Sequence, residues 1–354
     1  EKESNLSEVK LCSTCVLNIN SKFVPSDGEQ CLYCRDFSKE TVSLDNTAEQ
    51  IFHSKAIMED TIAKVKANRD KHDYDCLVLL SGGKDSTMAL YHMKTKYDLR
   101  ILALTVDNGL IFPTPVENIK AACRTLEVDH ILYKPYFMEK VYRWVLTNQV
   151  PISICRFCNP LNFNSGLQFA KRFKIPLVIH GYSKAQSELM GENSAVIPLW
   201  EENIAEHLQK LFEEIPETRN IGLTKPEITF LNENDITLLS PWYHEDYDIN
   251  KIREFLKEKL GWRDTEKSYP KFATNCMLYS LDTVLLRKRK GYNVVDCEAA
   301  RLVRFGELTK DQALANLDSD ISIPSVNNVL NRLGLSLNDV GLTEKELEKY
   351  SHFQ

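Results

Sequence analysis

Three absences limit what this chain can be. No uninterrupted apolar run approaches the ~20 residues that a membrane-spanning helix needs, and the first residues lack the apolar core of a secretion signal. The 44 Lys and Arg residues against 50 Asp and Glu residues give a net charge of −6, so no overall positive field indicates a nucleic-acid partner. Internal repeats and low-complexity tracts are absent too. We expect a cytoplasmic globular protein of about two domains, with no membrane partner.

The ten cysteines indicate metal rather than disulfides, because they occur largely in pairs in a chain expected to stay in a reducing compartment. Cys12 and Cys15 form one C-x2-C pair, and Cys31 and Cys34 form a second after fifteen residues. This spacing is typical of a four-cysteine zinc ribbon, in which four thiolates surround Zn²⁺ and a short hairpin joins the two pairs. Residues 1–45 are therefore predicted to be a zinc ribbon that depends on its metal to fold.

The central motif lies where an apolar run, residues 77–80, meets two glycines and then a helical pattern: Ser81-Gly82-Gly83-Lys84-Asp85-Ser86-Thr87. The pattern predicts a buried strand, a tight turn and a helix. The glycines allow a sharp turn and a close approach of backbone to ligand. Unpaired N–H groups at the start of the helix favour an anion, while Lys84 adds a positive charge and Ser86 a hydroxyl. The motif therefore predicts a phosphate site.

Further apolar runs at residues 101–106, 128–133 and 176–180 predict three more strands. A capping box of Thr114 and Glu117 predicts a helix after the first of them. Strands that alternate with helices indicate an α/β fold with a parallel, doubly wound, Rossmann-like sheet. The predicted organisation is a ribbon, a linker helix over residues 46–71, the sheet domain over 72–245 and a helical region over 246–354.

Polar clusters follow three of the predicted strands, and ligands of such sheets bind outside the C-terminal strand ends. The clusters are Ser81–Ser86, Asp107–Gly109 and His180–Ser183. Because these strand ends share one edge of the sheet, the clusters predict a nucleotide cleft there.

A second set of cysteines is divided between two parts of the chain: the segment between the third and fourth predicted strands, and a segment much later in the sequence. Cys155 and Cys158 form a lone C-x2-C pair, and Cys276 follows much later in the chain. Three thiolates could hold a [4Fe–4S] cluster with one iron open to substrate or sulfide. A second zinc, a redox pair or unrelated buried thiols are the alternatives.

The C-terminal region shows helical patterns, over residues 247–260 and 282–290 and after two capping boxes that begin at Thr309 and Thr343. We expect it to bind substrate or to form a homodimer. Its basic run, Arg287-Lys288-Arg289-Lys290, predicts a solvated helix end, with a phosphate clamp for a nucleotide sugar or RNA as the alternative.

The phosphate motif differs from the G-x-x-x-x-G-K-[ST] P-loop, because Asp85 follows Lys84. It resembles the SGGxDS signature of the PP-loop (N-type) ATP pyrophosphatases, which have a Rossmann-like sheet of the HUP type and cleave ATP between the α and β phosphates. The resemblance implies ATP and Mg²⁺ as cofactors and catalytic roles for Lys84, Asp85 and Ser86. The implied ATP-binding residues are Ser81, Gly82, Gly83, Lys84, Asp85, Ser86, Thr87, Asp107, His180 and Gly181.

Over nearly the whole chain the sequence is similar to the N-acetyl sugar amidotransferases of bacterial surface-polysaccharide and nonulosonic-acid pathways. The shared features are the two N-terminal cysteine pairs, the segment from Tyr74 to Thr87, the later cysteine segment and Gly306–Ala313. In that family a Gly-Glu-Asn element stands directly at the end of the fourth strand, whereas here it comes ten residues later, at 191–193. The resemblance implies a sugar or nucleotide-sugar substrate whose acetamido oxygen is adenylated, and a glutaminase partner that supplies ammonia to displace AMP.

A second resemblance is to tRNA-thiolating PP-loop enzymes, which carry a C-x2-C pair and a distant third cysteine around an iron–sulfur cluster. Cys155, Cys158 and Cys276 fit that layout, which gives these thiols a catalytic role in delivering sulfur. The Gly-His-Asn-x-x-Asp element of those enzymes is missing after the fourth strand. A nucleotide-binding regulator that contacts nucleic acid through the ribbon is a third hypothesis, disfavoured by the acidic net charge.

Overall fold

The computed structural model describes residues 9–37, 55–182, 204–220, 228–243, 248–265, 275–304, 306 and 308–352. Several sequence features fall outside these ranges, namely the Gly-Glu-Asn element at 191–193, Ser183, Tyr247, Thr274 and the first part of the linker helix.

A five-stranded parallel sheet organises the molecule, which confirms the doubly wound α/β fold. The strands are β3 (Cys76–Leu79), β4 (Ile101–Val106), β5 (Asp129–Tyr133), β6 (Leu177–Ile179) and β7 (Thr237–Leu239). Their order is β5-β4-β3-β6-β7, so the chain crosses to the other half of the sheet between β5 and β6, and the strand order reverses between the neighbours β3 and β6. The first four strands lie where the sequence predicts them. Strand β7 was not predicted, because three residues are too few to show a period.

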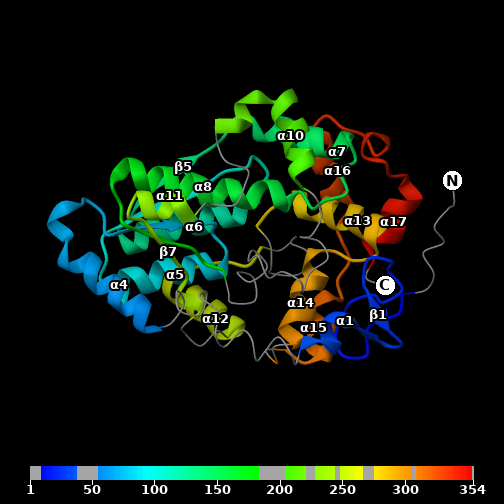
Figure 1. Cartoon of the computed structure of the whole chain (residues 1–354), viewed down its shortest axis with the longest axis horizontal. Helices are drawn as coiled ribbons and strands as arrows, with labels where there is room; N and C mark the ends of the chain where they lie inside the picture. Colours follow the sequence, from blue (N-terminus) through cyan, green and yellow to red (C-terminus); the bar gives the residue numbers. More distant parts are fainter. Residues whose placement is uncertain are drawn as a thin grey trace.

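Helices cover both faces of the sheet (Figure 1). On one face, α4 (Lys55–Ala67), α5 (Lys84–Thr95), α6 (Pro113–Leu126) and α12 (Ile249–Leu260) share one apolar core with the sheet. On the other face, α8 (Cys155–Phe173) lies over β3, and α11 (Ile228–Glu233) joins the same core. This arrangement leaves the C-terminal strand ends between β3 and β6 open to a ligand.

Helix α6 begins at Pro113, two residues before Pro115, which would be the first helical residue after a cap at Thr114, so the expected capping box at Thr114 is wrong. Phe112 is the N-cap residue and offers no side-chain cap. Pro113 opens the helix because its fixed φ suits the first helical position and its missing N–H needs no partner there. Helix α12 has Asp248 as its N-cap and ends at Gly261, whose φ of 63° lies in the left-handed region.

The C-terminal region is helical, as predicted. Helix α13 spans Leu278–Lys290 and packs with α16 (Ile323–Arg332) and α17 (Glu344–Ser351). They share an apolar core with α7 (Met138–Thr147) and α10 (Ile204–Glu214). Both predicted capping boxes are present, at Thr309 before α15 (Lys310–Leu317) and at Thr343 before α17. Short 3-10 helices complete the described chain: η1 (Arg69–Lys71), η2 (Pro216–Asn220), η3 (Pro241–Tyr243) and η4 (Asn338–Val340).

The basic run at the end of α13 faces inward, so the prediction of a solvated helix end is wrong. Arg287 is buried and donates to the carbonyls of Tyr350 and His352 at 3.1 Å each. Lys288 pairs with Glu346 at 2.8 Å, and Arg289 donates to the carbonyl of Val150, in the loop after α7, at 2.9 Å. Long basic side chains can bury their methylene stems while their charged groups donate hydrogen bonds to unpaired carbonyls at the ends of neighbouring helices. These contacts dock α17 against α13.

The N-terminal cysteine unit forms a hairpin of β1 (Ser26–Asp27) and β2 (Gln30–Cys31), followed by α1 (Leu32–Arg35). It shares an apolar core with α13, α15 and α14 (Val294–Arg304). In Figure 1 the blue N-terminal segments accordingly lie beside the orange α14 and α15, at the end of the molecule away from α4.

Within the described ranges, no helix has both the length and the apolar character to cross a membrane.

Candidate functional site

The phosphate motif folds as a strand, a turn and a helix, with its hydroxyls gathered inside the turn. Helix α5 begins at Lys84, and its N-cap Gly83 supplies no side chain to the first N–H groups. The backbone N–H of Ser81 donates to Ser86 Oγ at 3.1 Å, and the two serine hydroxyls lie 3.0 Å apart. The helix dipole and the amides of the first turn therefore point towards a place for an anion.

Side chains from distant segments hold the turn in place by donating hydrogen bonds to its backbone carbonyls. Trp262 Nε1 donates to the carbonyl of Gly82 at 2.9 Å, and Asn118 Nδ2 donates to the same oxygen at 3.2 Å. Trp242 Nε1 donates to the carbonyl of Asp85 at 3.2 Å. Gly82 has a φ of 77°, and a Cβ there would lie 2.2 Å from the carbonyl oxygen of Pro115. Only glycine fits this position.

The end of β6 approaches the motif as closely as backbone allows. A Cβ on Gly181 would lie 2.6 Å from the backbone nitrogen of Ser86. The neighbouring His180 is buried, and its ring packs against Phe163 and Tyr182 with centroids 5.3 and 5.6 Å apart. The predicted clusters after β3 and β6 therefore meet at the point where the strand order reverses.

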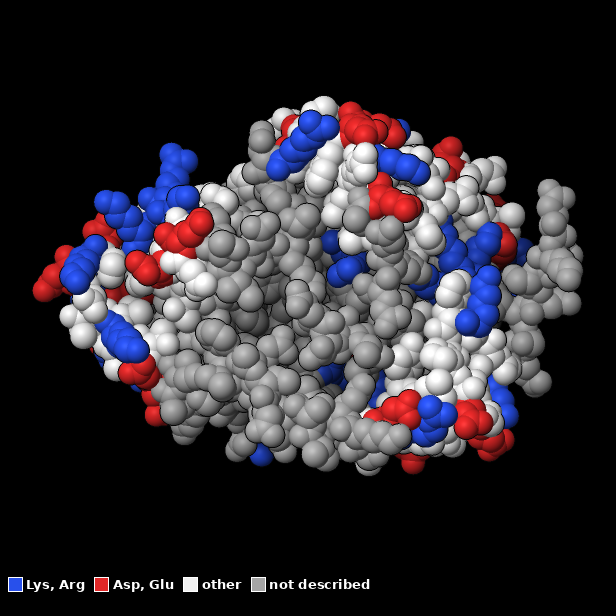
Figure 2. Space-filling model, in the orientation of Figure 1, with Lys and Arg blue, Asp and Glu red and all other residues white. Residues whose placement is uncertain are grey.

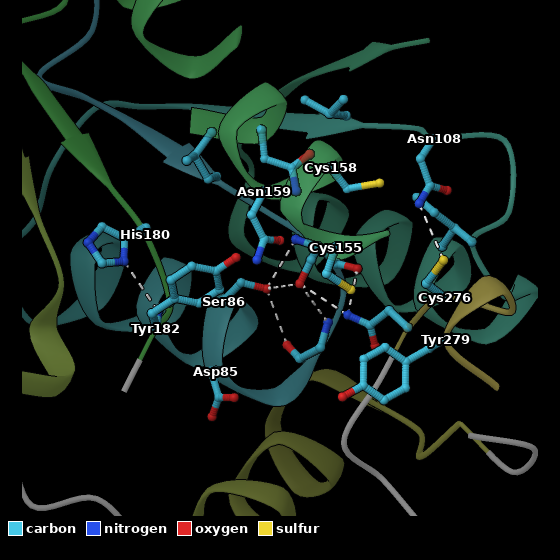
Figure 3. Close-up of a pocket in the computed structure, with 18 of the residues that line it drawn as sticks. Asp85, Ser86, Asn108, Cys155, Cys158, Asn159, His180, Tyr182, Cys276 and Tyr279 are labelled. Atoms are coloured by element: carbon cyan, nitrogen blue, oxygen red, sulfur yellow. Dashed lines mark hydrogen bonds between the residues drawn. The ribbon is translucent and has the colours of Figure 1, made fainter. Parts of the chain in front are cut away.

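A cavity of about 350 Å³ opens at this point. Its floor is the phosphate motif with the ends of β3, β4 and β6, and its walls come from the start of α8 and from α13 and α14 (Figure 3). The lining includes most of the predicted site residues: Ser81, Gly83, Lys84, Asp85, Ser86, His180, Gly181, Cys155, Cys158 and Cys276.

Three predicted site residues lie outside this lining. The carbonyl of Gly82 accepts from Trp262 and Asn118, and Thr87 is fully buried in α5. Asp107 accepts a hydrogen bond from the N–H of Gly109 at 2.8 Å and lies 3.7 Å from the Lys134 ammonium. Its neighbour Asn108 lines the cavity instead.

Lys84 and Asp85 form the charged pair of the cavity. Lys84 Nζ lies 2.9 Å from Asp85 Oδ2, and both side chains are largely buried. In this arrangement the lysine charge is held close to the turn, where a phosphate would compete with Asp85 for it.

The three cysteines of the second set converge on the cavity from two distant segments. The side-chain amide of Asn108 donates to Cys276 Sγ at 3.3 Å, and the Tyr142 hydroxyl lies 3.0 Å from Cys158 Sγ. Burial raises the pKa of all three thiols, and the charges of neighbouring groups raise it further for Cys155 and Cys158. The ligand-free thiols are therefore protonated at neutral pH. A thiophilic metal or cluster would have to displace those protons.

Cys276 reaches the cavity because its segment pairs with the chain that follows β4. The N–H of Phe112 donates to the carbonyl of Asn275 at 2.9 Å, and the N–H of Met277 donates to that of Leu110 at 2.8 Å. This antiparallel bridge also places Asn275 Nδ2 at 3.1 Å from Ser81 Oγ. Sequence reasoning missed Asn275, because nothing local marks an asparagine that contacts a loop nearly two hundred residues away.

Other cavity residues were missed for the same reason. Carboxamides of Asn159 and Asn162 come from the turn of α8 after the cysteine pair, and Tyr279 and Glu298 come from α13 and α14. Asp282 is buried in the wall, where its carboxylate accepts from Ser153 Oγ at 2.6 Å and from the N–H of Ile154 at 3.0 Å. The cavity thus combines the phosphate motif at its floor with polar side chains from α8, α13 and α14 in its walls.

The N-terminal cysteines fit a tetrahedral metal. The sulfur atoms of Cys12, Cys15, Cys31 and Cys34 all lie within 4.8 Å of one another, and Cys15 Sγ and Cys31 Sγ are 3.8 Å apart. A zinc ion with Zn–S bonds of ~2.3 Å requires sulfur–sulfur distances of about 3.8 Å. None of the ten cysteines forms a disulfide.

Comparisons with known proteins agree with this site. Residues 75–156 match the model of the family described as queuosine biosynthesis protein QueC. An uncharacterised protein of Methanocaldococcus jannaschii is 22% identical over 328 residues, which are 92% of this chain and 99% of the relative.

Two solved structures resemble the chain remotely. The NH3-dependent NAD synthetase of Campylobacter jejuni, in complex with nitrate, matches 84% of this chain and 99% of its own at 11% identity and a TM-score of 0.35. A predicted subunit of tRNA methyltransferase from M. jannaschii matches 62% of this chain and 89% of its own at 14% identity and a TM-score of 0.32. Likenesses this remote carry no argument about function.

The matched segment runs from β3 to the start of α8 and so contains the phosphate motif, the end of β4 and the first residue of the second cysteine set. The motif, the parallel sheet and the cavity at the strand reversal all lie in or around that segment. The family match and the phosphate motif together support an enzyme of the PP-loop ATP pyrophosphatase class.

Proposed function

We propose that the chain is an ATP-dependent amidotransferase that adenylates the acetamido oxygen of an N-acetyl sugar and replaces that oxygen with ammonia nitrogen. One observation carries the proposal: the phosphate motif shares a single cavity with carboxamides and hydroxyls of the wall, among them those of Asn159, Asn162 and Tyr279. A nucleotide on the motif and a small polar acceptor against the wall would then be close enough to react.

The proposed chemistry has two steps, adenylation and displacement by ammonia. The acetamido oxygen attacks the α-phosphorus of ATP, and the bond to the β-phosphate breaks to release pyrophosphate. The amides of the first turn of α5, the Ser86 hydroxyl and Lys84 are placed to stabilise the charge that develops on that leaving group. Ammonia then attacks the activated carbon, loses a proton, and AMP departs with the former acetamido oxygen.

Mg²⁺ fits the donor set of the motif, because Asp85 offers a carboxylate beside the expected phosphates. A bound Mg²⁺ would neutralise charge on the departing phosphates. Asp85 holds Lys84 in the ligand-free cavity, so binding of ATP with its metal would exchange this ion pair for contacts to phosphate.

The inward-facing basic run supports a small acceptor over RNA. Arg287 donates to a carbonyl near the end of α17, Lys288 pairs with Glu346, and Arg289 donates to the carbonyl of Val150 after α7. On the face drawn in Figure 2, Lys and Arg residues of the described chain are mixed with Asp and Glu residues. Neither observation provides the basic stripe by which a protein tracks a phosphate backbone.

The proposal is tested by incubating the full chain with ATP, Mg²⁺, a nucleotide-linked N-acetyl sugar and nitrogen-15 ammonium. Mass spectrometry of the sugar is expected to show that NH labelled with nitrogen-15 has replaced one oxygen. Free ammonium stands in for the glutaminase subunit proposed as partner. Release of AMP without incorporation of nitrogen-15, across a panel of N-acetyl sugars, would contradict the amidotransferase.

Sulfur transfer is the second candidate, and the convergence of Cys155, Cys158 and Cys276 on the cavity favours it. Three thiolates could hold a [4Fe–4S] cluster whose open iron faces the adenylated acceptor. Protein purified without oxygen should then be brown and contain iron, and Cys276→Ser should remove both colour and activity. Full amidation activity in iron-free protein would exclude a required cluster.

A further inference from the structure

Helix α14 connects the two places in the molecule where cysteine chemistry is expected. Its first half lines the cavity through Val294, Val295 and Glu298. Its last residue, Arg304, reaches the N-terminal cysteine unit. Glu298 and Arg304 are six residues apart, roughly 9 Å along a helix axis. One rigid element therefore touches both sites.

Arg304 lies against two of the four sulfur atoms and is almost fully buried, with 9% of its surface exposed. Its Nη1 is 4.0 Å from Cys15 Sγ and 3.9 Å from Cys34 Sγ. Its Nε and Nη2 are buried and find no hydrogen-bond partner among the described residues. An arginine buried with so few partners is costly unless it faces negative charge.

A second cation approaches the same unit from α15. Lys310 Nζ donates to the carbonyl of Cys12 at 2.6 Å and to that of Ser13 at 3.4 Å. These carbonyls belong to the turn that carries the first cysteine pair. Lys310 thus holds the backbone of one metal-binding turn, while Arg304 faces the sulfur atoms themselves.

The two positive charges of Arg304 and Lys310 equal in number the net negative charge of the four cysteine thiolates with a bound divalent metal. Four thiolates around a divalent ion carry a net charge of about −2. Such a charge inside a protein must be compensated by cations or hydrogen-bond donors, and partners around the ligands tune metal affinity. Arg304 and Lys310 are two cations from the C-terminal region, and both lie at the unit.

We propose that Arg304 and Lys310 complete the metal site of Cys12, Cys15, Cys31 and Cys34. Bound zinc thereby ties the N-terminal unit to helix α14 and fixes the wall of the cavity. The metal site then links the N-terminal unit to helices α14 and α15, rather than belonging to the N-terminal ribbon alone. This inference concerns the chain's own residues around zinc and does not depend on which acceptor the cavity takes.

The test measures the zinc affinity of the purified full chain by competition with a chelating dye. Arg304→Met should weaken zinc binding by about 10–100-fold, the usual effect of removing a partner of metal ligands. Arg304→Lys, which keeps the charge, should lose less. Lys345→Met removes the same charge from an exposed position on α17 and should leave zinc affinity unchanged. Wild-type affinity in Arg304→Met would overturn the proposal.

A second measurement tests whether bound zinc stabilises helix α14, rather than affecting the four cysteine ligands alone. Removing zinc from the wild-type chain should speed hydrogen exchange in residues 294–304 while β4, in the middle of the sheet, stays protected. Unchanged exchange in 294–304 would contradict the tie to the cavity wall. If Arg304→Met fails to fold, Lys310→Met carries the affinity test, and its retention of wild-type zinc binding would overturn the proposal equally.

Discussion

At the scale of single residues, the lack of a side chain at Gly181 lets the end of β6 lie directly against the backbone of the phosphate motif. A Cβ at this position would lie 2.6 Å from the nitrogen and 2.7 Å from the Cα of Ser86, both backbone atoms that cannot turn aside. Gly181→Ala should therefore push β6 away from the phosphate motif and weaken ATP binding by at least about tenfold. Isothermal titration with ATP measures the loss.

A matched glycine provides the control for this prediction. A Cβ on Gly261 would meet nothing within 4 Å, but its φ of 63° is strained for alanine. Gly261→Ala should cost about 1 kcal/mol of unfolding free energy and bind ATP normally. The account of Gly181 fails if both variants bind ATP equally well.

Asp282 carries a prediction about pH. Burial raises its pKa from 3.8 to about 6, although Ser153 and the N–H of Ile154 favour the charged form. A raised carboxyl pKa adds stability that is fully present below 3.8 and is lost as the pH rises through 6. Two pH units correspond to roughly 3 kcal/mol.

Asp282→Asn should remove this dependence. Relative to wild type, the variant's unfolding free energy should rise between pH 4 and pH 7 by up to about 3 kcal/mol. Denaturant titrations at several pH values give the difference. A difference that stays flat across this range would show that the buried carboxyl does not titrate as described.

At the scale of elements, the end of α13 is where sequence and structure disagree most. Four consecutive basic residues usually indicate a solvated helix end, yet here the first two, Arg287 and Lys288, anchor α17. Arg287→Met would leave the carbonyls of Tyr350 and His352 without this donor. The expected cost is about 2–3 kcal/mol of unfolding free energy.

Thermal unfolding and RNA binding together check this interpretation. Lys345→Met, at an exposed position of α17, serves as the control of equal charge change. Only Arg287→Met should lower the melting temperature, and neither variant should change RNA binding. Reduced RNA binding with unchanged stability in Arg287→Met would restore the idea of a phosphate clamp.

The strands and capped helices could be read from the sequence because their signals are local. Alternating or continuous apolar runs predict β3 to β6, and the boxes at Thr309 and Thr343 lie where predicted. Strand β7 escaped because its three residues give no period. The capping box at Thr114 failed because Pro113 is the first residue of α6, which makes Phe112 rather than Thr114 the N-cap.

At the scale of the whole molecule, the sequence located the phosphate motif and both cysteine sets but not what surrounds them. Trp262, Asn275 and Glu298 reach the site from segments that only tertiary packing brings near. The same holds for Arg304 beside the N-terminal cysteines. Contacts between distant segments leave no local pattern, so a motif search finds the floor of the cavity and misses its walls.

The central claim is that this cavity cleaves ATP between the α and β phosphates. The most direct measurement is chromatography of the products from ATP labelled separately at the α and γ phosphates, with Mg²⁺, an N-acetyl sugar and ammonium present. The account predicts α label in AMP and γ label in pyrophosphate. It also predicts that Lys84→Ala and Ser86→Ala each slow the reaction by about 10²–10³-fold. ADP and orthophosphate as the main products would contradict it.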